Sequence, residues 1–116
     1  MEIEELAQLH KALSVPVRLR ILTLISEKSL CVNAITRFLQ ISQPAVSQHL
    51  AVLRHAGLVK RDKQGYMVHY TLNQSRLGEF NQAVAGFLKE EVATRISRGK
   101  TSSGVLANSW EVRKKT

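Results

Sequence analysis

Cysteine is nearly absent from this chain, and so are long apolar runs. The single cysteine, Cys31, cannot form a disulfide within the chain, which favours a reducing compartment. No apolar stretch approaches the roughly 20 residues that a membrane-spanning helix needs. The chain opens with the acidic segment MEIEELAQLH and not with a basic and then apolar signal segment. These absences predict a cytoplasmic protein that does not enter a membrane.

Acidic residues are scarce as well. The chain has 17 Lys and Arg residues against 9 Asp and Glu residues, which gives a formal net charge of +8. The pI is near 10.2. A surface field of this sign attracts polyanions. Because no membrane segment is expected, the charge favours nucleic acid, here double-stranded DNA, over an anionic membrane surface.

The patterns that carry catalysis are missing too. No paired carboxylates share a helix face, and no Ser, His and Asp residues cluster as a proton relay. Gly99-Lys100-Thr101 imitates the end of a phosphate-binding loop, but Thr94 stands where that motif needs its leading glycine. With 116 residues the chain is one domain, short for an enzyme with a deep pocket. We therefore expect no enzymatic activity and no cofactor.

The stretch around which the chain is organised is SQPAVSQHLAVLRHAGLV, residues 42–59. On a helix that turns about 100° per residue, one narrow sector is apolar and contains Val46, Leu50 and Leu53. The opposite side suits base edges and phosphates, because it carries Ser47, Gln48, Ala51 and Arg54. Ser42 is placed to cap this helix, and Gly57 to end it. Alone, the pattern is equally typical of an ordinary solvated amphipathic helix.

The rest of the chain provides the context of this helix. Apolar spacing predicts three earlier helices, over residues 2–13, 16–27 and 32–39, with Arg18 and Arg20 pointing outward from the second. Two β-rich segments, residues 58–61 and 66–72, predict a hairpin with its turn at residues 62–65. The turn region is cationic, which fits phosphate binding but also the protection of a sheet edge. The order predicts a mainly α fold, a winged helix-turn-helix of five helices and a two-stranded wing.

A last helix is expected from Arg76 to about residue 92. Its apolar stripe is too wide to stay wet and contains Leu77, Phe80, Val84, Phe87, Leu88 and Val92. The other elements already supply a core, so this stripe is expected to meet its own copy in a homodimer, although part of it packs on its own domain. Residues 1–97 would then form one DNA-binding and dimerisation domain. Residues 98–116 would be a flexible basic tail, with Trp110 as the exception, because a lone tryptophan in such a tail usually docks on a surface.

Three blocks occur in order between residues 6 and 92: LSVPVRLRILTLI, SQPAVSQHLAVLRHAGLVK and RDKQGYMVHYTL. They resemble the successive signatures of the ArsR/SmtB family of dimeric transcriptional repressors, with the spacing of that family. The resemblance implies a homodimer joined by the first and last helices, which binds an inverted-repeat operator and is released by an inducer. It places interface residues in both helices, namely Leu6, Leu77, Phe80, Val84 and Phe87.

The same resemblance, transferred position by position, implies which residues touch DNA. Base and phosphate contacts would come from Ser42, Gln43, Ser47 and Gln48. Contacts to the DNA backbone would come from Arg54 and from the wing residues Arg61 and Lys63. His49 lies about 60° from the centre of the apolar stripe, so it is expected to be a boundary histidine that hydrogen-bonds locally and does not read bases.

The effector sites of the family match this chain poorly. Arsenic-sensing members carry C-V-C-D near the start of the third helix, where this chain has Cys31-Val32-Asn33-Ala34. Zinc-sensing members use Asp and His pairs on the last helix, and residues 76–92 contain neither type. We therefore expect no metal site. Cys31, at the cap position of the helix expected over residues 32–39, is the candidate sensor, and it is either a buried, inert small hydrophobe or a thiol activated by a helix N-terminus.

Two alternatives to an inducer-released repressor stay open. One is a redox-responsive regulator using Cys31, which would act through sulfenylation or an intersubunit disulfide because the chain has no second cysteine. The other is a winged-helix protein-interaction module, because a fold does not fix a function. Salt separates the second alternative from a DNA-binding protein, because DNA binding weakens steeply as salt is raised.

Overall fold

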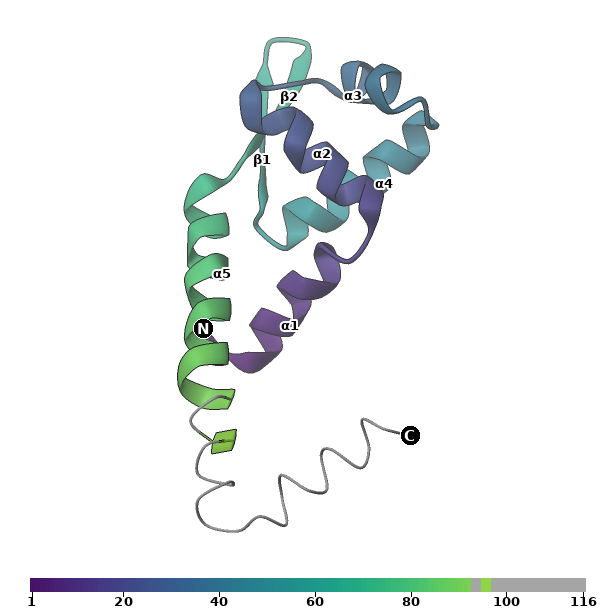
Figure 1. The fold of residues 1–116 in the computed structure, drawn as a ribbon. Coiled ribbons are helices and arrows are strands. Elements are labelled where there is room, and N and C mark those ends of the chain that lie inside the picture. Colours follow the sequence, from purple (N-terminus) through teal and green to yellow (C-terminus); the bar gives the residue numbers. More distant parts are fainter. Residues whose placement is uncertain (93–94, 97–116) are drawn as a thin grey trace, which may run out of the picture. The chain divides into compact units, whose positions relative to one another are not determined.

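Four helices precede a hairpin in this chain, and a fifth helix follows it (Figure 1). In the computed structural model the elements are α1 (Ile3–Ala12), α2 (Pro16–Glu27), α3 (Val32–Leu39), α4 (Gln43–His55), β1 (Val59–Gln64), β2 (Met67–Leu72), α5 (Gln74–Gly86) and a π-helical segment, η1 (Phe87–Val92). The structure describes residues 1–92 and 95–96. The predicted mainly α, winged helix-turn-helix fold is confirmed. The predicted tail, residues 98–116 with Trp110, lies outside the described residues.

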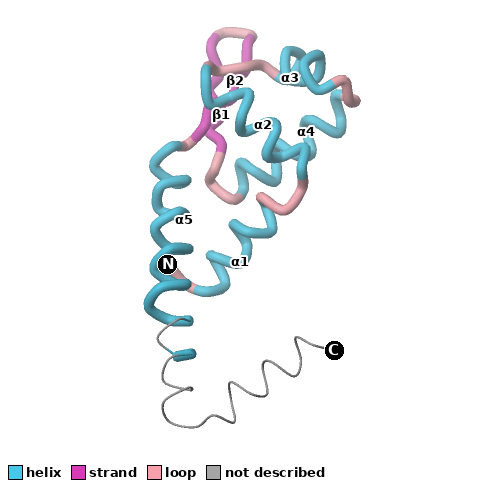
Figure 2. The backbone as a smooth tube through the Cα atoms, viewed as in Figure 1, coloured by secondary structure: helices cyan, strands magenta, loops and turns pink. Residues whose placement is uncertain are grey.

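The chain divides into two units at Phe80. Met1–Phe80 form the first unit, and the second begins at Asn81. The first unit contains α1 to α4, the hairpin and the first half of α5, joined by short loops (Figure 2). Across the described ranges, no helix is long and apolar enough to cross a membrane.

The core of the first unit is built on α2 and α4, which contact each other. Ile21 of α2 and Val46, Leu50 and Leu53 of α4 are at most 1% exposed and belong to one apolar cluster. Other elements complete this cluster with Leu9, Ala12, Leu22, Ile25, Leu30, Ile35, Leu58 and Val59. The apolar sector predicted for α4 therefore faces the core, and the polar side of the helix is left outside.

Local chemistry fixes both ends of α4. The Ser42 hydroxyl accepts a hydrogen bond from the Ala45 amide at 3.3 Å, as an N-cap residue should. After the helix, Gly57 adopts a φ of 82°, a left-handed conformation that favours glycine. A side chain there would also press on Arg76, whose Nε lies 3.3 Å from the position of a Cβ. The predicted cap and the predicted end of the helix are thus confirmed.

The hairpin closes later than the sequence predicts. Strand β1 continues to Gln64, which pairs with Met67, so Gly65 and Tyr66 form a two-residue turn. Gly65 has a φ of 63°, which suits such a turn. The predicted turn at residues 62–65 is wrong, because pairing between the strands outweighs the turn-like composition of those residues. Lys63 therefore lies in β1.

A further contact extends this small sheet. Leu30 pairs with Tyr70 of β2 through two backbone hydrogen bonds, from the Leu30 amide at 3.1 Å and from the Tyr70 amide at 2.8 Å. Leu30 is also 7% exposed and belongs to the core cluster. The segment between α2 and α3 is thereby tied to the wing.

The last helix reaches the predicted end, Val92, but changes its type on the way. Helix α5 begins at Gln74, after Asn73 accepts a hydrogen bond from the Arg76 amide at 3.3 Å, and ends at Gly86. The wider π-helical turns of η1 follow, in which hydrogen bonds join residues five apart, so the spacing of three and four that defines the predicted stripe does not continue past Gly86. No residue of α5 is buried in the single chain.

Candidate nucleic-acid interface

The side of α4 opposite the core is open to solvent. Its exposed side chains include the four predicted from periodicity, Ser47, Gln48, Ala51 and Arg54, and also Pro44 and His55. Ser42 and Gln43 are exposed at the N-terminal end, where the helix dipole favours an anion, although Pro44 has no amide proton and the Ala45 amide already donates to the Ser42 hydroxyl. The helix therefore presents hydrogen-bonding groups along one face and a site suited to phosphate at its start.

The wing brings further cations to the end of this face. In the hairpin register Val59, Arg61 and Lys63 share one face, because side chains alternate along a strand. Val59 is 3% exposed and faces the core. Arg61 and Lys63 lie further along the same face of β1, where they are exposed. β1 contacts α4, and an open hollow between these elements, hereafter the cationic hollow, is lined by Arg54, Val59, Lys60, Arg61 and Lys63.

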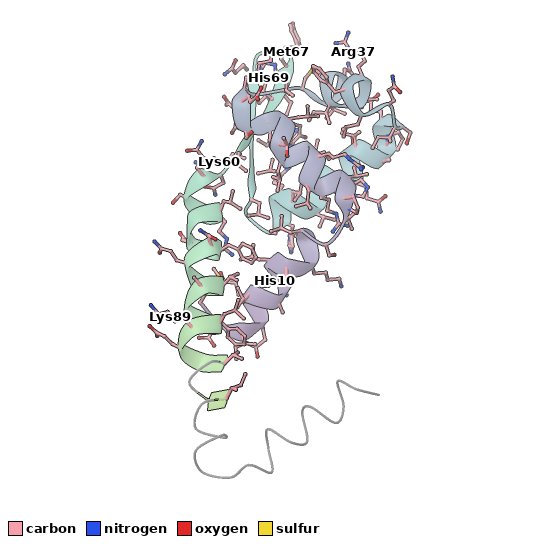
Figure 3. All side chains as sticks on the ribbon, in the orientation of Figure 1. His10, Arg37, Lys60, Met67, His69 and Lys89 are labelled. Carbon is pink, nitrogen blue, oxygen red and sulfur yellow. The ribbon has the colours of Figure 1, made fainter. Side chains whose placement is uncertain are left out.

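No carboxylate neutralises the cations of the hollow in the part of the chain that the structure describes. Glu5 and Glu79 pair with Arg76 and not with these cations. Asp62 lies on the other face of β1, where its Oδ2 accepts a hydrogen bond from Gln64 Nε2 at 2.9 Å. Figure 3 labels Lys60 near the base of the hairpin and Met67 near its tip. The hollow is thus a site of unpaired positive charge next to the exposed face of α4, which is the arrangement that phosphate binding requires.

Arg18 and Arg76 both support α4 through contacts that the sequence does not predict. Arg18 of α2 is half-buried, and its Nε donates a hydrogen bond to Nδ1 of His49 at 3.2 Å. The outward orientation predicted for Arg18 is therefore wrong, because acceptors on neighbouring helices hold its guanidinium. Arg20 is exposed, as predicted. His49 is half-buried at the edge of the stripe, as expected of a boundary residue, but its hydrogen bond is with Arg18 of another helix and is not the local one predicted.

Arg76 of α5 supports the other end of α4. Its Nε donates to the carbonyl oxygen of Ala56 at 3.4 Å, and its Nη2 lies 2.8 Å from Oε1 of Glu5. The hydrogen bond with Glu5 raises the pKa of the Arg76 guanidinium, against a smaller opposing effect of desolvation. Asn73 contributes from its Nδ2, which donates to the Gly57 carbonyl at 2.8 Å. No short sequence signal could have revealed these contacts, since their partners are distant in the chain.

The candidate sensor Cys31 is the N-cap residue of α3, as predicted, but its side chain makes no capping hydrogen bond. The thiol is half-buried, so the expectation of a buried residue is only partly met. Among the described residues, no group of three or more His, Cys, Asp or Glu side chains is arranged to hold a metal ion. The role of Cys31 stays a prediction.

The predicted interface residues differ in their burial. In the first unit, Leu6 is already buried in the single chain, with 7% of its surface exposed, whereas Leu77 and Phe80 are half-buried against the core. The Phe80 ring also makes an edge contact with His10, with 4.9 Å between the ring centroids. In the second unit, Val84 and Phe87 are half-buried. Their assignment to a subunit interface stays a prediction.

Comparisons with known proteins agree with this arrangement. Residues 15–61, which hold α2 to α4 and the start of β1, match the family described as bacterial regulatory protein, arsR family. The chain is 39% identical over 82 residues to an uncharacterized HTH-type transcriptional regulator of Methanocaldococcus jannaschii, a match that covers 70% of this chain and 92% of that protein. It is 48% identical over 67 residues to the arsenical resistance operon repressor of Escherichia coli K12, which covers 57% of each protein.

A solved structure shares the fold. It is the homodimeric winged helix-turn-helix DNA-binding domain from Mycobacterium bovis, with a TM-score of 0.63 and 27% identity. The match covers 77% of this chain and 85% of that one. Together with the positions of α4 and the wing, these matches establish that the chain belongs to the ArsR/SmtB family of winged helix-turn-helix DNA-binding transcriptional regulators, which are not enzymes.

Proposed function

We propose that this regulator is a repressor that binds an inverted-repeat operator as a homodimer and leaves the operator in response to a signal. The observation that carries the proposal is the position of the cationic hollow beside the exposed face of α4. Sequence-specific proteins need base-edge contacts for specificity and phosphate contacts for affinity. One side of the first unit offers groups suited to both.

The proposed DNA-contacting residues are of two kinds, those that contact bases and those that contact the DNA backbone. The exposed face of α4 enters the major groove, with its base and phosphate contacts made by Ser42, Gln43, Ser47 and Gln48. A Gln side chain suits this task because its amide can form two hydrogen bonds with the edge of adenine. The DNA backbone is held by Arg54, Arg61 and Lys63, which have no acidic partner within the described ranges.

A homodimer is favoured by the state of the terminal helices. Helix α5 has no buried residue in the single chain, and two apolar side chains are widely exposed: Ile3 of α1 is 66% exposed and Leu88 of η1 is 57% exposed. The domain from Mycobacterium bovis is a homodimer. The interface is assigned to Leu6, Leu77, Phe80, Val84 and Phe87. Its two-fold symmetry would place the two half-sites about one helical turn of DNA apart.

DNA selection followed by titration tests this function. The protein is used to select duplexes from a random library, and its affinity for the selected duplex and for a scrambled one is then measured at several salt concentrations. We expect the selected sites to be inverted repeats and the affinity to fall steeply with salt, because bound phosphates release counterions. Failure to enrich any sequence, together with an affinity that salt does not change, would favour the protein-interaction alternative.

Val84→Asp tests the dimer. The new carboxylate would lie among apolar side chains without a partner and without its hydration, so we expect monomers in sedimentation. Operator affinity should fall as well, because a single reading helix loses the gain from tethering. Val84→Leu, which stays apolar, is the control. An intact dimer in the Asp variant would rule out this interface.

A further inference from the structure

Arg18 contacts two helices other than its own. Its Nε donates to His49 Nδ1 in the middle of α4, at 3.2 Å. Its Nη1 lies 3.3 Å from the carbonyl oxygen of Lys11 and 3.4 Å from that of Ala12, in the last turn of α1. One guanidinium near the start of α2 thus joins the end of α1 to the helix proposed to read DNA.

The chemistry of both groups makes the contact directional. A guanidinium has five donors and no acceptor, so Nδ1 of His49 must accept with its lone pair. The contact therefore requires the imidazole tautomer that carries its proton on Nε2. At the other end, the carbonyl groups of the last turn of α1 form the negative end of the helix dipole, which favours a cation. Arg18 therefore satisfies fixed acceptors on both helices at once.

A second arginine joins the same two helices at another point. Arg76 donates to the carbonyl oxygen of Ala56 at the end of α4, and it pairs with Glu5 of α1 at 2.8 Å. All these groups belong to the first unit. Helix α4 is thus tied to α1 through its middle by Arg18 and through its end by Arg76. Two separated attachments constrain the tilt of a helix as well as its position.

We propose that Arg18 is a positioning residue for DNA reading, which acts through His49 to set the placement of α4 on α1. His49 directly follows Gln48 and Ser47, so a change in its attachment moves the readers themselves. Hydrogen bonds to base edges tolerate only a few tenths of an ångström. Since α1 is assigned to the subunit interface, the bridge makes the spacing of the two reading helices depend on the dimer. This inference rests on the function proposed above.

The test uses four single variants, one double variant and two duplexes. Arg18→Gln and His49→Leu each break the bridge, His49→Asn keeps an acceptor near the position of Nδ1, and Arg20→Gln removes a neighbouring exposed arginine as a matched control. Each variant is titrated with a duplex selected by the wild-type protein and with a scrambled duplex, at several salt concentrations. Thermal unfolding of each variant is followed in parallel.

We expect Arg18→Gln and His49→Leu to lower the ratio of specific to random affinity by roughly tenfold, the size of one lost base contact. His49→Asn should restore most of this ratio, and Arg20→Gln should keep it. The double variant of Arg18→Gln and His49→Leu should be no worse than either single one, because both remove the same contact. The salt slope should not change. If Arg18→Gln does not fold, Arg18→Lys replaces it. The lysine ammonium keeps the charge, but it lacks the planar set of donors with which the guanidinium bonds to both helices at once.

Three results would overturn the proposal. Equal weakening on both duplexes with a salt slope lower by about one would make Arg18 a direct phosphate contact. An unchanged ratio in His49→Leu would deny any role of the bridge. Equal losses in His49→Asn and His49→Leu would point to packing alone. If the wild-type protein selects no sequence at all, the proposed function fails first, and this outcome is distinct from the other three.

Discussion

Helix α4 and strand β1 lie next to each other along the chain but are held in place to very different degrees. Three side chains of α4 are at most 1% exposed, and the helix is capped, ended by a left-handed glycine and bridged by two arginines. In β1 only Val59 is buried, and the next five residues are exposed. The helix is therefore fixed in position, whereas most of the strand is held by its partner strand alone.

This difference matches the two kinds of contact that DNA binding needs. A base edge must be met at hydrogen-bonding distance and angle, so its reader must be placed accurately. A phosphate can be held through charge, which acts over several ångströms and tolerates a mobile side chain. The residues on α4 are thus suited to specificity and the cations of β1 to affinity. Substitutions in the two elements should separate these properties.

Leu50→Ala should have the largest effect. Leu50 is 1% exposed in the core, and its truncation leaves a cavity under the reading helix, so we expect the free energy of unfolding to fall by about 2–5 kcal/mol. Met67→Ala, at the tip of the hairpin where Met67 is 50% exposed, should change it by less than about 0.5 kcal/mol. Chemical denaturation measures both values. Similar losses in the two variants would show that the helix and the wing are equally anchored.

Gln48→Ala should come next and should affect specificity. Loss of one base-edge contact is expected to lower discrimination between the operator and random DNA by about 1–3 kcal/mol, with random DNA bound as before. Gln8→Ala, the same substitution at an exposed position of α1, is the control and should leave discrimination intact. The comparison would collapse if Gln48→Ala weakened both DNAs to the same extent.

Lys63→Ala should show the opposite behaviour with a smaller loss. Removal of one phosphate contact weakens the operator and random DNA alike and lowers the salt slope by about one. Lys89→Ala, an exposed lysine in the second unit, should leave the slope unchanged. A selective loss of operator binding in Lys63→Ala would make the wing a reader and erase the division of roles.

The same contrast explains which features the sequence could predict. The faces and ends of α4 follow from periodicity and from cap chemistry, which act over a few residues. The sequence predicts the turn of the hairpin at the wrong residues, because the pairing of Gln64 with Met67 depends on contacts between the two strands and not on local composition. The hydrogen bond between Arg18 and His49 joins residues 31 apart in the chain. Leu30 pairs with Tyr70 through one isolated bridge and not through a strand. Such contacts depend on the assembled core and leave no local pattern.

Cys31→Ser should have the smallest effect, because Cys31 lies on neither element. Cys31 occupies the N-cap position of α3, but its thiol makes no capping hydrogen bond, and serine is a better N-cap residue. We expect operator affinity to change by less than about twofold.

Trivalent arsenic requires several thiolates, and with one cysteine in the chain a dimer supplies at most two. Micromolar arsenite or zinc should therefore not release the wild-type protein in a gel-shift assay. Release by arsenite that disappears in Cys31→Ser would make Cys31 an arsenic ligand, and release by peroxide alone, lost in the same variant, would favour the redox alternative.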